Sequence, residues 1–254
     1  MDEGKLYVCY PIIVGNGAKY TTVNLAFAYK EKFTQAKIAI VDFDFKNPYL
    51  AYSFTDHDQI HGIDNLIDKI DAESLTRELF KENMISVNGI DVLKGTKLIG
   101  RDYLLTKTHV TTIIDFLKEI YDYIFVAVSP EPDNAGTVYA LSEADEILLI
   151  VRNNISNYLR FPQAMNIVDT YKAMREEPKI IYNMYMKNSR VAFNSLFEEY
   201  GTKTVAASVP LIVETIDNNN YAGLKANAPG KKDKSPALEF YQQAILTLDP
   251  DIEI

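Results

Sequence analysis

Residues 14–26 read Val-Gly-Asn-Gly-Ala-Lys-Tyr-Thr-Thr-Val-Asn-Leu-Ala, a glycine-containing loop that leads into a stretch with helical spacing of apolar residues. The apolar run Leu6-Tyr-Val-Cys-Tyr10 precedes it, and a second run, Lys37-Ile-Ala-Ile-Val-Asp-Phe-Asp44, follows it. Short apolar runs of this kind are typical of buried strands. The order predicts a β-α-β unit whose loop presents backbone N–H groups at the start of a helix, an arrangement that suits phosphate groups.

The same alternation of apolar runs and helical spacing continues to the end of the chain. It predicts strands at 6–10, 37–43, 90–93, 122–128, 146–151, 178–183 and 204–209. It predicts helices at 22–33, 61–70, 109–120, 136–142, 157–174, 189–200 and 235–247. We therefore expect one α/β domain over residues 1–254, a doubly wound and mostly parallel sheet flanked by helices.

Composition limits the environment and the partners. With 47% hydrophobic residues the 254-residue chain can bury a full core. Cys9 lies in an apolar run and is expected to be a buried hydrophobe. No signal peptide and no apolar run near 20 residues stand out, and the acidic C-terminal end does not suit a membrane anchor, so we expect a cytoplasmic protein. The net charge of −9 argues against unspecific DNA binding.

Two further groups of residues are expected to be solvated surface positions. His57 and His61 could share a helix face, but neither they nor His109 shows the spacing of a metal site. A small basic cluster near the C-terminus has an aspartate inside it and is interpreted as a loop; it comprises Lys231, Lys232 and Lys234.

In its context the loop resembles that of the ParA/MinD family, deviant Walker ATPases of the SIMIBI class of P-loop proteins. The loop of that family reads K-G-G-V-G-K-T-T. If Thr21 and Thr22 set the register, Gly15 stands at the signature lysine, Lys19 at the last glycine and Tyr20 at the phosphate lysine. The resemblance thus implies an ATP-binding segment that has lost both functional lysines, formed by Gly15, Asn16, Gly17, Ala18, Lys19, Tyr20, Thr21 and Thr22.

Other landmarks of the family follow in order over nearly the whole chain. Residues 41–50, Val-Asp-Phe-Asp-Phe-Lys-Asn-Pro-Tyr-Leu, are similar to the Walker A′ segment, and residues 90–95 to a conserved strand and turn. Residues 121–130, Tyr-Asp-Tyr-Ile-Phe-Val-Ala-Val-Ser-Pro, resemble the Walker B strand with Ala127 in place of its aspartate. Residues 180–183 end in Asn183 where the family has a base-contacting asparagine, and Pro210 with the stretch 218–223 resembles the C-terminal nucleotide-binding region.

The resemblance assigns a role to each retained polar residue, and each also has a simpler interpretation. Thr21 and Asp42 would hold Mg²⁺ if a nucleotide binds, or would be a helix-opening residue and a strand-end acid. Asp44 would orient the attacking water if the protein is active, or would cap a turn. Asn183 would contact the base, or would be an ordinary turn residue.

The lost charges predict weak nucleotide binding. Each charge-assisted contact is worth about 1.5–3 kcal/mol, so the loss of two cations should lower affinity by about two to four powers of ten. Tyr20 is neutral at pH 7 and can fill the phosphate position without neutralising it. Lys19 is either a displaced phosphate ligand or a solvated loop lysine. We expect ATPase activity to be weak or absent, no cofactor to be required, and ATP with Mg²⁺ to bind weakly if at all.

Three functions are compatible with these observations. The first is a degenerate ParA/MinD-like pseudo-ATPase, a homodimeric scaffold or positioning factor with a protein partner in a polar or envelope-associated machine such as a pilus, secretion or conjugation apparatus. TadZ/CpaE proteins are its functional analogy, and the 17 tyrosines, Tyr182 and Tyr185 among them, suit an interface as well as an ordinary distribution. The second is an active positioning ATPase that uses Lys19. The third is a relative of bacterial tyrosine kinases, which lacks the terminal tyrosine cluster of that group.

Overall fold

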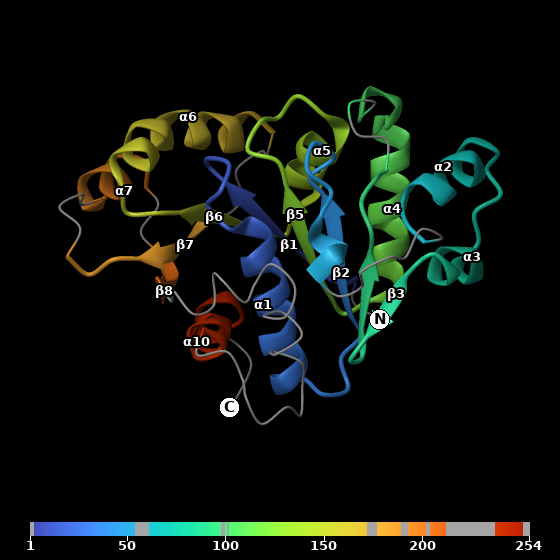
Figure 1. The fold of residues 1–254 in the computed structure, drawn as a ribbon, viewed down its shortest axis with the longest axis horizontal. Coiled ribbons are helices and arrows are strands. Elements are labelled where there is room, and N and C mark those ends of the chain that lie inside the picture. The colour runs from blue at the N-terminus through green and yellow to red at the C-terminus, as the bar shows by residue number, and fades with distance from the viewer. Residues whose placement is uncertain are drawn as a thin grey trace.

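The computed structural model describes residues 3–53, 61–97, 100, 102–171, 177–188, 193–201, 204–211 and 237–250. An eight-stranded sheet runs through its centre in the order β3-β4-β2-β5-β1-β6-β7-β8 (Figure 1). Every pairing is parallel except that of β3 with β4. The strands are β1 (Lys5–Pro11), β2 (Ile38–Phe43), β3 (Ile85–Val87), β4 (Ile90–Leu93), β5 (Tyr123–Val128), β6 (Glu146–Val151), β7 (Lys179–Tyr185) and β8 (Val205–Pro210).

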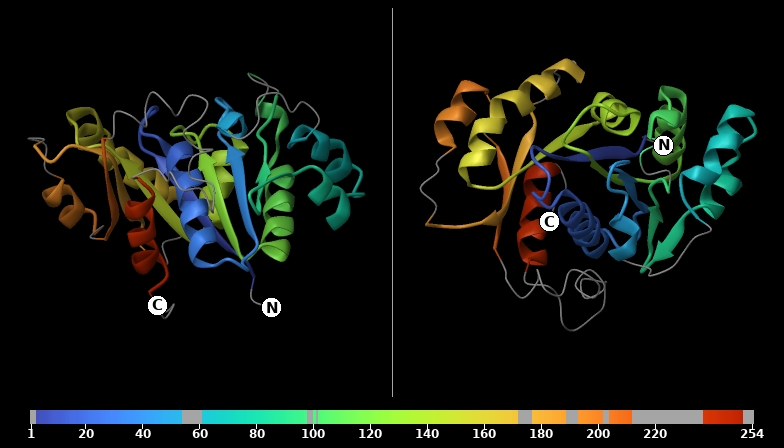
Figure 2. Two further views of the ribbon diagram at one scale, coloured as in Figure 1. Left: turned by 60° about the horizontal axis from the view of Figure 1, so that its bottom comes forward. Right: turned by 45° about the horizontal axis from the view of Figure 1, so that its top comes forward.

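Helices cover both faces of the sheet, as Figures 1 and 2 show. One face packs against α1 (Ala18–Lys32) and α10 (Leu238–Leu248), which lie side by side. The other face packs against α2 (Asp64–Asp71), α3 (Arg77–Glu82), α4 (Lys107–Ile120), α5 (Ala135–Glu143), α6 (Ile155–Tyr171) and α7 (Asn194–Glu199). The predicted doubly wound α/β fold is confirmed.

Both faces of the central strands are buried, which explains why their sequences are almost continuously apolar. In β1, Leu6, Val8 and Tyr10 enter the core beneath α4, α5 and α6, while Tyr7 and Cys9 enter the core beneath α1 and α10. Cys9 is fully buried, as predicted. The two cores fix the loop between β1 and α1 at the carboxyl edge of the sheet.

The predicted strands agree with the structure to within two residues, but three local features differ. Helix α1 begins at Ala18, four residues before the predicted start, because Gly17 adopts a φ of 85° and turns the chain directly into the helix. The short helix α3 and the antiparallel strand β3 were not predicted. Strands β3 and β4 are joined through Asn88 and Gly89, both with positive φ, and an Asn-Gly pair is a strong hairpin signal.

Several predictions fall wholly or partly outside the described residues. They concern His57, the stretch 218–223, the cluster Lys231, Lys232 and Lys234, and the ends of the predicted helices at 172–174, 189–192 and 235–236. His109 is described and is buried; its Nδ1 accepts from the backbone N–H of Thr106, 3.1 Å away, at the start of α4. Within the described part of the chain, no helix combines the length and apolar character needed to cross a membrane.

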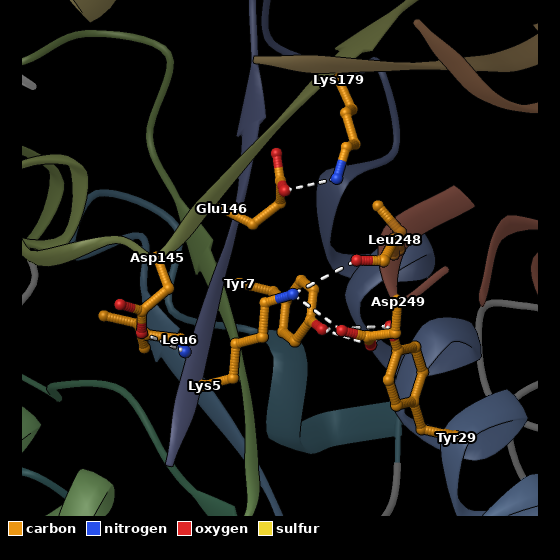
Figure 3. Close-up of polar contacts among 9 residues, drawn as sticks. All are labelled: Lys5, Leu6, Tyr7, Tyr29, Asp145, Glu146, Lys179, Leu248 and Asp249. Carbon is orange, nitrogen blue, oxygen red and sulfur yellow. Dashed lines mark hydrogen bonds and ion pairs between the residues drawn. The ribbon is translucent and has the colours of Figure 1, made fainter. Parts of the chain in front are cut away.

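The amino edge of the sheet is closed by a polar cluster around Asp249, directly after α10 (Figure 3). The Tyr7 and Tyr29 hydroxyls donate to one carboxylate oxygen of Asp249, at 2.5 and 2.6 Å. Lys5 Nζ lies 2.7 Å from the other oxygen and 3.2 Å from the carbonyl oxygen of Leu248. We call Lys5, Tyr7, Tyr29 and Asp249 the C-terminal clamp, because they join the end of α10 to β1 and α1.

Candidate functional site

The loop between β1 and α1 owes its shape to two glycines. Gly15 and Gly17 have φ angles of 87° and 85°, a conformation that other residues seldom adopt. A Cβ atom on Gly17 would lie 2.2 Å from Nδ2 of Asn183, so a side chain at this position would displace the Asn183 amide from the Asn16 carbonyl. The Gly17 carbonyl accepts the N–H of Thr21 at 2.9 Å, and the helix starts there.

A network of buried asparagine side chains supports the loop between β1 and α1. Asn16 donates from Nδ2 to the Ile150 carbonyl at 2.8 Å and to Oδ1 of Asn157 at 2.7 Å. Asn183 donates from Nδ2 to the carbonyl of Asn16 at 2.8 Å. The asparagine expected at a nucleotide base therefore supports the loop. Asn157, at the start of α6, was not singled out from the sequence, because only the fold brings it to Asn16.

A cavity of about 310 Å³ opens at this carboxyl edge, between the loop and the ends of β2 and β5. Its lining comprises Pro11, Val14, Gly15, Asn16, Gly17, Ala18, Lys19, Asp44, Asn47, Val128 and Pro130. The first five loop positions predicted for a nucleotide, 15–19, are thus brought together with Asp44. The other predicted positions are absent from the lining; they are Tyr20, Thr21, Thr22, Asp42, Asn183 and Pro210.

Lys19 is the cation on the cavity wall, and its Nζ forms an ion pair with Oδ2 of Asp44. The Lys19 side chain is 27% exposed and that of Asp44 is 9% exposed. The other oxygen of Asp44 accepts from the Ser129 hydroxyl at 2.8 Å and from the backbone N–H of Asn47 at 3.2 Å. The structure therefore directs residue 19, and not residue 20, toward the cavity.

Tyr20 and Thr21 face the opposite side of α1, toward α10. The ring of Tyr20 meets that of Tyr241 edge to face, with centroids 6.3 Å apart, and its buried hydroxyl has no hydrogen-bond partner among the described residues. Thr21 is fully buried, and its Oγ1 lies 3.2 Å from the Tyr241 hydroxyl. Thr22 donates to the carbonyl of Ala18 at 2.9 Å. The hydroxyl of Thr21, expected at a metal, and that of Thr22, expected at the nucleotide, are therefore both used inside the protein.

Asp42 stabilises the turn that carries Asp44 and Asn47. It is fully buried, and its two carboxylate oxygens accept the backbone N–H groups of Asp44 at 3.2 Å and Leu50 at 2.9 Å. Burial raises the pKa of Asp42 to about 7, although the Lys19 charge and the two N–H groups act in the opposite direction. Ala127 pairs with Asp42 in the sheet and supplies no carboxylate.

Comparisons with known proteins support the fold. No protein-family model matches the sequence, and no curated protein matches it either. A ParA family ATPase from Chlorobium tepidum TLS is structurally similar, with a TM-score of 0.75 and 15% identity over 99% of this chain and 94% of that one. A putative plasmid partition protein from Borrelia burgdorferi B31 bound to AMPPNP has a TM-score of 0.75 and 15% identity, with 98% of this chain and 100% of that one covered. The MinC:MinD cell division complex of Aquifex aeolicus has a TM-score of 0.74 and 15% identity, with 99% of this chain and 98% of that one covered. This chain thus has the fold of ParA/MinD ATPases.

Proposed function

We propose that this protein is a ParA/MinD-fold pseudo-ATPase, a homodimeric scaffold or positioning factor that recruits a protein partner without turning over ATP. The observation that carries the proposal is the placement of Thr21. Its hydroxyl lies in the interior against Tyr241, on the face of α1 that turns away from the cavity. A threonine held in this way cannot bind Mg²⁺ at the cavity unless α1 and α10 are repacked.

The other residues that were expected to hold a metal or a phosphate support the same proposal. Phosphoryl transfer depends on cations and a metal that offset the charge of the transferred group. Asp42 accepts two backbone N–H groups, and Ala127 stands where the family resemblance places a carboxylate. Among the described lining residues Lys19 is the single cation, and Asp44 already neutralises it. The cavity therefore provides little of the charge that hydrolysis needs.

A partner-binding role is supported by the fold and by the chemistry of the surface residues. A structurally similar MinD from Aquifex aeolicus was solved in complex with MinC, so this architecture accommodates a protein partner. Tyr182 and Tyr185 remain candidates for an interface; their rings lie 5.7 Å apart, and both side chains are only partly buried. A pilus, secretion or conjugation apparatus is the type of machine that we propose for the partner.

The second candidate is an active positioning ATPase, and Lys19 favours it. This lysine lies on the cavity wall beside the loop N–H groups and could exchange Asp44 for a phosphate oxygen. In that case Thr21 would also have to leave Tyr241 and reach the metal. The two candidates therefore differ in what they require of Thr21.

ATP turnover with Mg²⁺ separates these candidates. We expect phosphate release by the wild-type protein to equal that of Lys19→Ala and Thr21→Val, with an active ParA family ATPase as the positive control. Turnover that is clearly higher in the wild type and lost in both variants would establish the ATPase. Light scattering tests the dimer: a monomer at high concentration, with and without ATP, contradicts it. Crosslinking in cells followed by mass spectrometry identifies the partner.

A further inference from the structure

The ion pair between Lys19 and Asp44 lies where an incoming anion would need the lysine. It joins the first turn of α1 to the residue that follows β2, and both side chains line the cavity. The same cavity is bordered by the N-terminal end of α1, which attracts negative charge. Asp44 and an anion bound at the loop would thus compete for the ammonium group of Lys19.

Asp44 is held in place for this interaction. Its Oδ1 accepts the Ser129 hydroxyl from the end of β5 and the N–H of Asn47 from its own turn, while Oδ2 is directed to Lys19. Its side chain is only 9% exposed. A carboxylate fixed by two other donors loses little conformational freedom when it pairs with lysine, so the pair is more persistent than one between mobile surface side chains.

We propose that Asp44 is an internal competitor that sets the affinity of this cavity for phosphate-type anions. Lys19 binds Asp44 in the anion-free protein, and a phosphate group must displace the carboxylate to reach the lysine. This inference rests on the proposed function, because a carboxylate that organises metal or water for hydrolysis would assist the phosphate. In the present cavity Asp44 opposes it.

The proposal reverses the effect that is expected when Asp44 is substituted. Removal of Asp44 from a hydrolytic site weakens activity, whereas its removal here releases Lys19 and removes a nearby negative charge. Both changes favour an anion, since like charges a few ångströms apart repel and the freed ammonium attracts. Asp44→Asn keeps an oxygen that can accept from Ser129 and Asn47 and removes only the charge.

The test is calorimetric titration of inorganic pyrophosphate in EDTA, which removes divalent metals. We expect Asp44→Asn to bind pyrophosphate at least about tenfold more tightly than the wild type, which corresponds to about 1.4 kcal/mol. Lys19→Ala/Asp44→Asn should lose this gain. Glu119→Gln is the matched control, because it removes one acid from an exposed ion pair with Arg77 and changes the net charge equally. Asp44→Ser replaces Asp44→Asn if the latter does not fold.

Three outcomes would overturn the proposal that Asp44 competes with the anion. They are equal or weaker pyrophosphate binding by Asp44→Asn, no detectable pyrophosphate binding by any variant, and an equal gain in Glu119→Gln. A second measurement needs no ligand: acetylation of Lys19 by an N-hydroxysuccinimide ester should be several times faster in Asp44→Asn than in the wild type, and an unchanged rate contradicts the proposal. ATP turnover in the same samples reports on the proposed function separately, so either proposal can fail alone.

Discussion

An ion pair between a lysine and an aspartate lies near each end of α1, but the two pairs have different surroundings. At the amino edge of the sheet, Asp249 accepts two tyrosine hydroxyls as well as Lys5, and both tyrosines are fully buried. At the carboxyl edge, Lys19 and Asp44 line a cavity of about 310 Å³. The first pair is part of the C-terminal clamp and closes the structure, whereas the second faces the cavity in which we propose that an anion replaces Asp44.

The clamp should give the largest effect on stability. Asp249→Ala leaves two fully buried phenols without their acceptor, and each buried donor left unsatisfied costs about 1–3 kcal/mol, whereas Lys5, with 35% of its side chain exposed, stays partly solvated. We therefore expect the free energy of unfolding to fall by about 4 kcal/mol in urea denaturation. Tyr29→Phe, which removes a single donor, should cost about 1 kcal/mol. A loss below about 1 kcal/mol for Asp249→Ala would show that the clamp is not a stabilising element.

The contributions of Asp42 at the carboxyl edge and of Asp249 at the amino edge to the free energy of unfolding should change with pH in opposite directions. The folded-state pKa of Asp42, at the carboxyl edge, is about 7 against an ordinary value of 3.8. Its contribution to stability is therefore fully present below pH 4 and is lost as the pH rises through 7, by roughly 4 kcal/mol. Burial acts to raise the pKa of Asp249, but hydrogen bonds from Lys5, Tyr29 and Tyr7 hold it below the ordinary value, so the clamp weakens in acid.

Urea denaturation at intervals between about pH 4 and pH 7, the window between the ordinary and the folded-state pKa of Asp42, measures the Asp42 component. The wild-type unfolding free energy should contain a component that falls as the pH rises, and Asp42→Asn should lack it. The same slope in both proteins would mean that Asp42 does not titrate in this range.

Thr21→Val tests the contact between the first turn of α1 and α10. The substitution keeps the shape and removes the hydroxyl bonded to Tyr241, so the unfolding free energy should fall by about 1 kcal/mol. Tyr241→Phe should cost a similar amount, and the double variant should cost less than the two single losses together, because both remove one bond. Fully additive losses would contradict the observed bond.

Lys19→Ala should have the smallest effect. The lysine side chain is 27% exposed, and partly solvated ion pairs contribute little, so the unfolding free energy should change by less than about 1 kcal/mol. A loss comparable to that of Asp249→Ala would make the Lys19 pair a structural element and remove the contrast between the two ends of α1.

The sequence predicted the sheet well because buried parallel strands leave nearly continuous apolar runs, and each of the seven predicted strands is found. It missed β3 and α3, which are too short to show a clear period. The loop was recognised from Gly15 and Gly17, but the direction of Lys19 was not. That direction depends on where α1 begins, and consecutive helical residues point about 100° apart.

The sequence alone determined the α/β fold and the position of the loop, since both depend on local pattern and residue type. Tertiary structure decided which polar groups meet. Tyr7 and Asp249, separated by 242 positions, and Asn16 and Asn183, separated by 167, come together only when the sheet is assembled. Hydrogen bonds depend on distances of a few tenths of an ångström, and no periodicity of the chain encodes contacts between such distant residues.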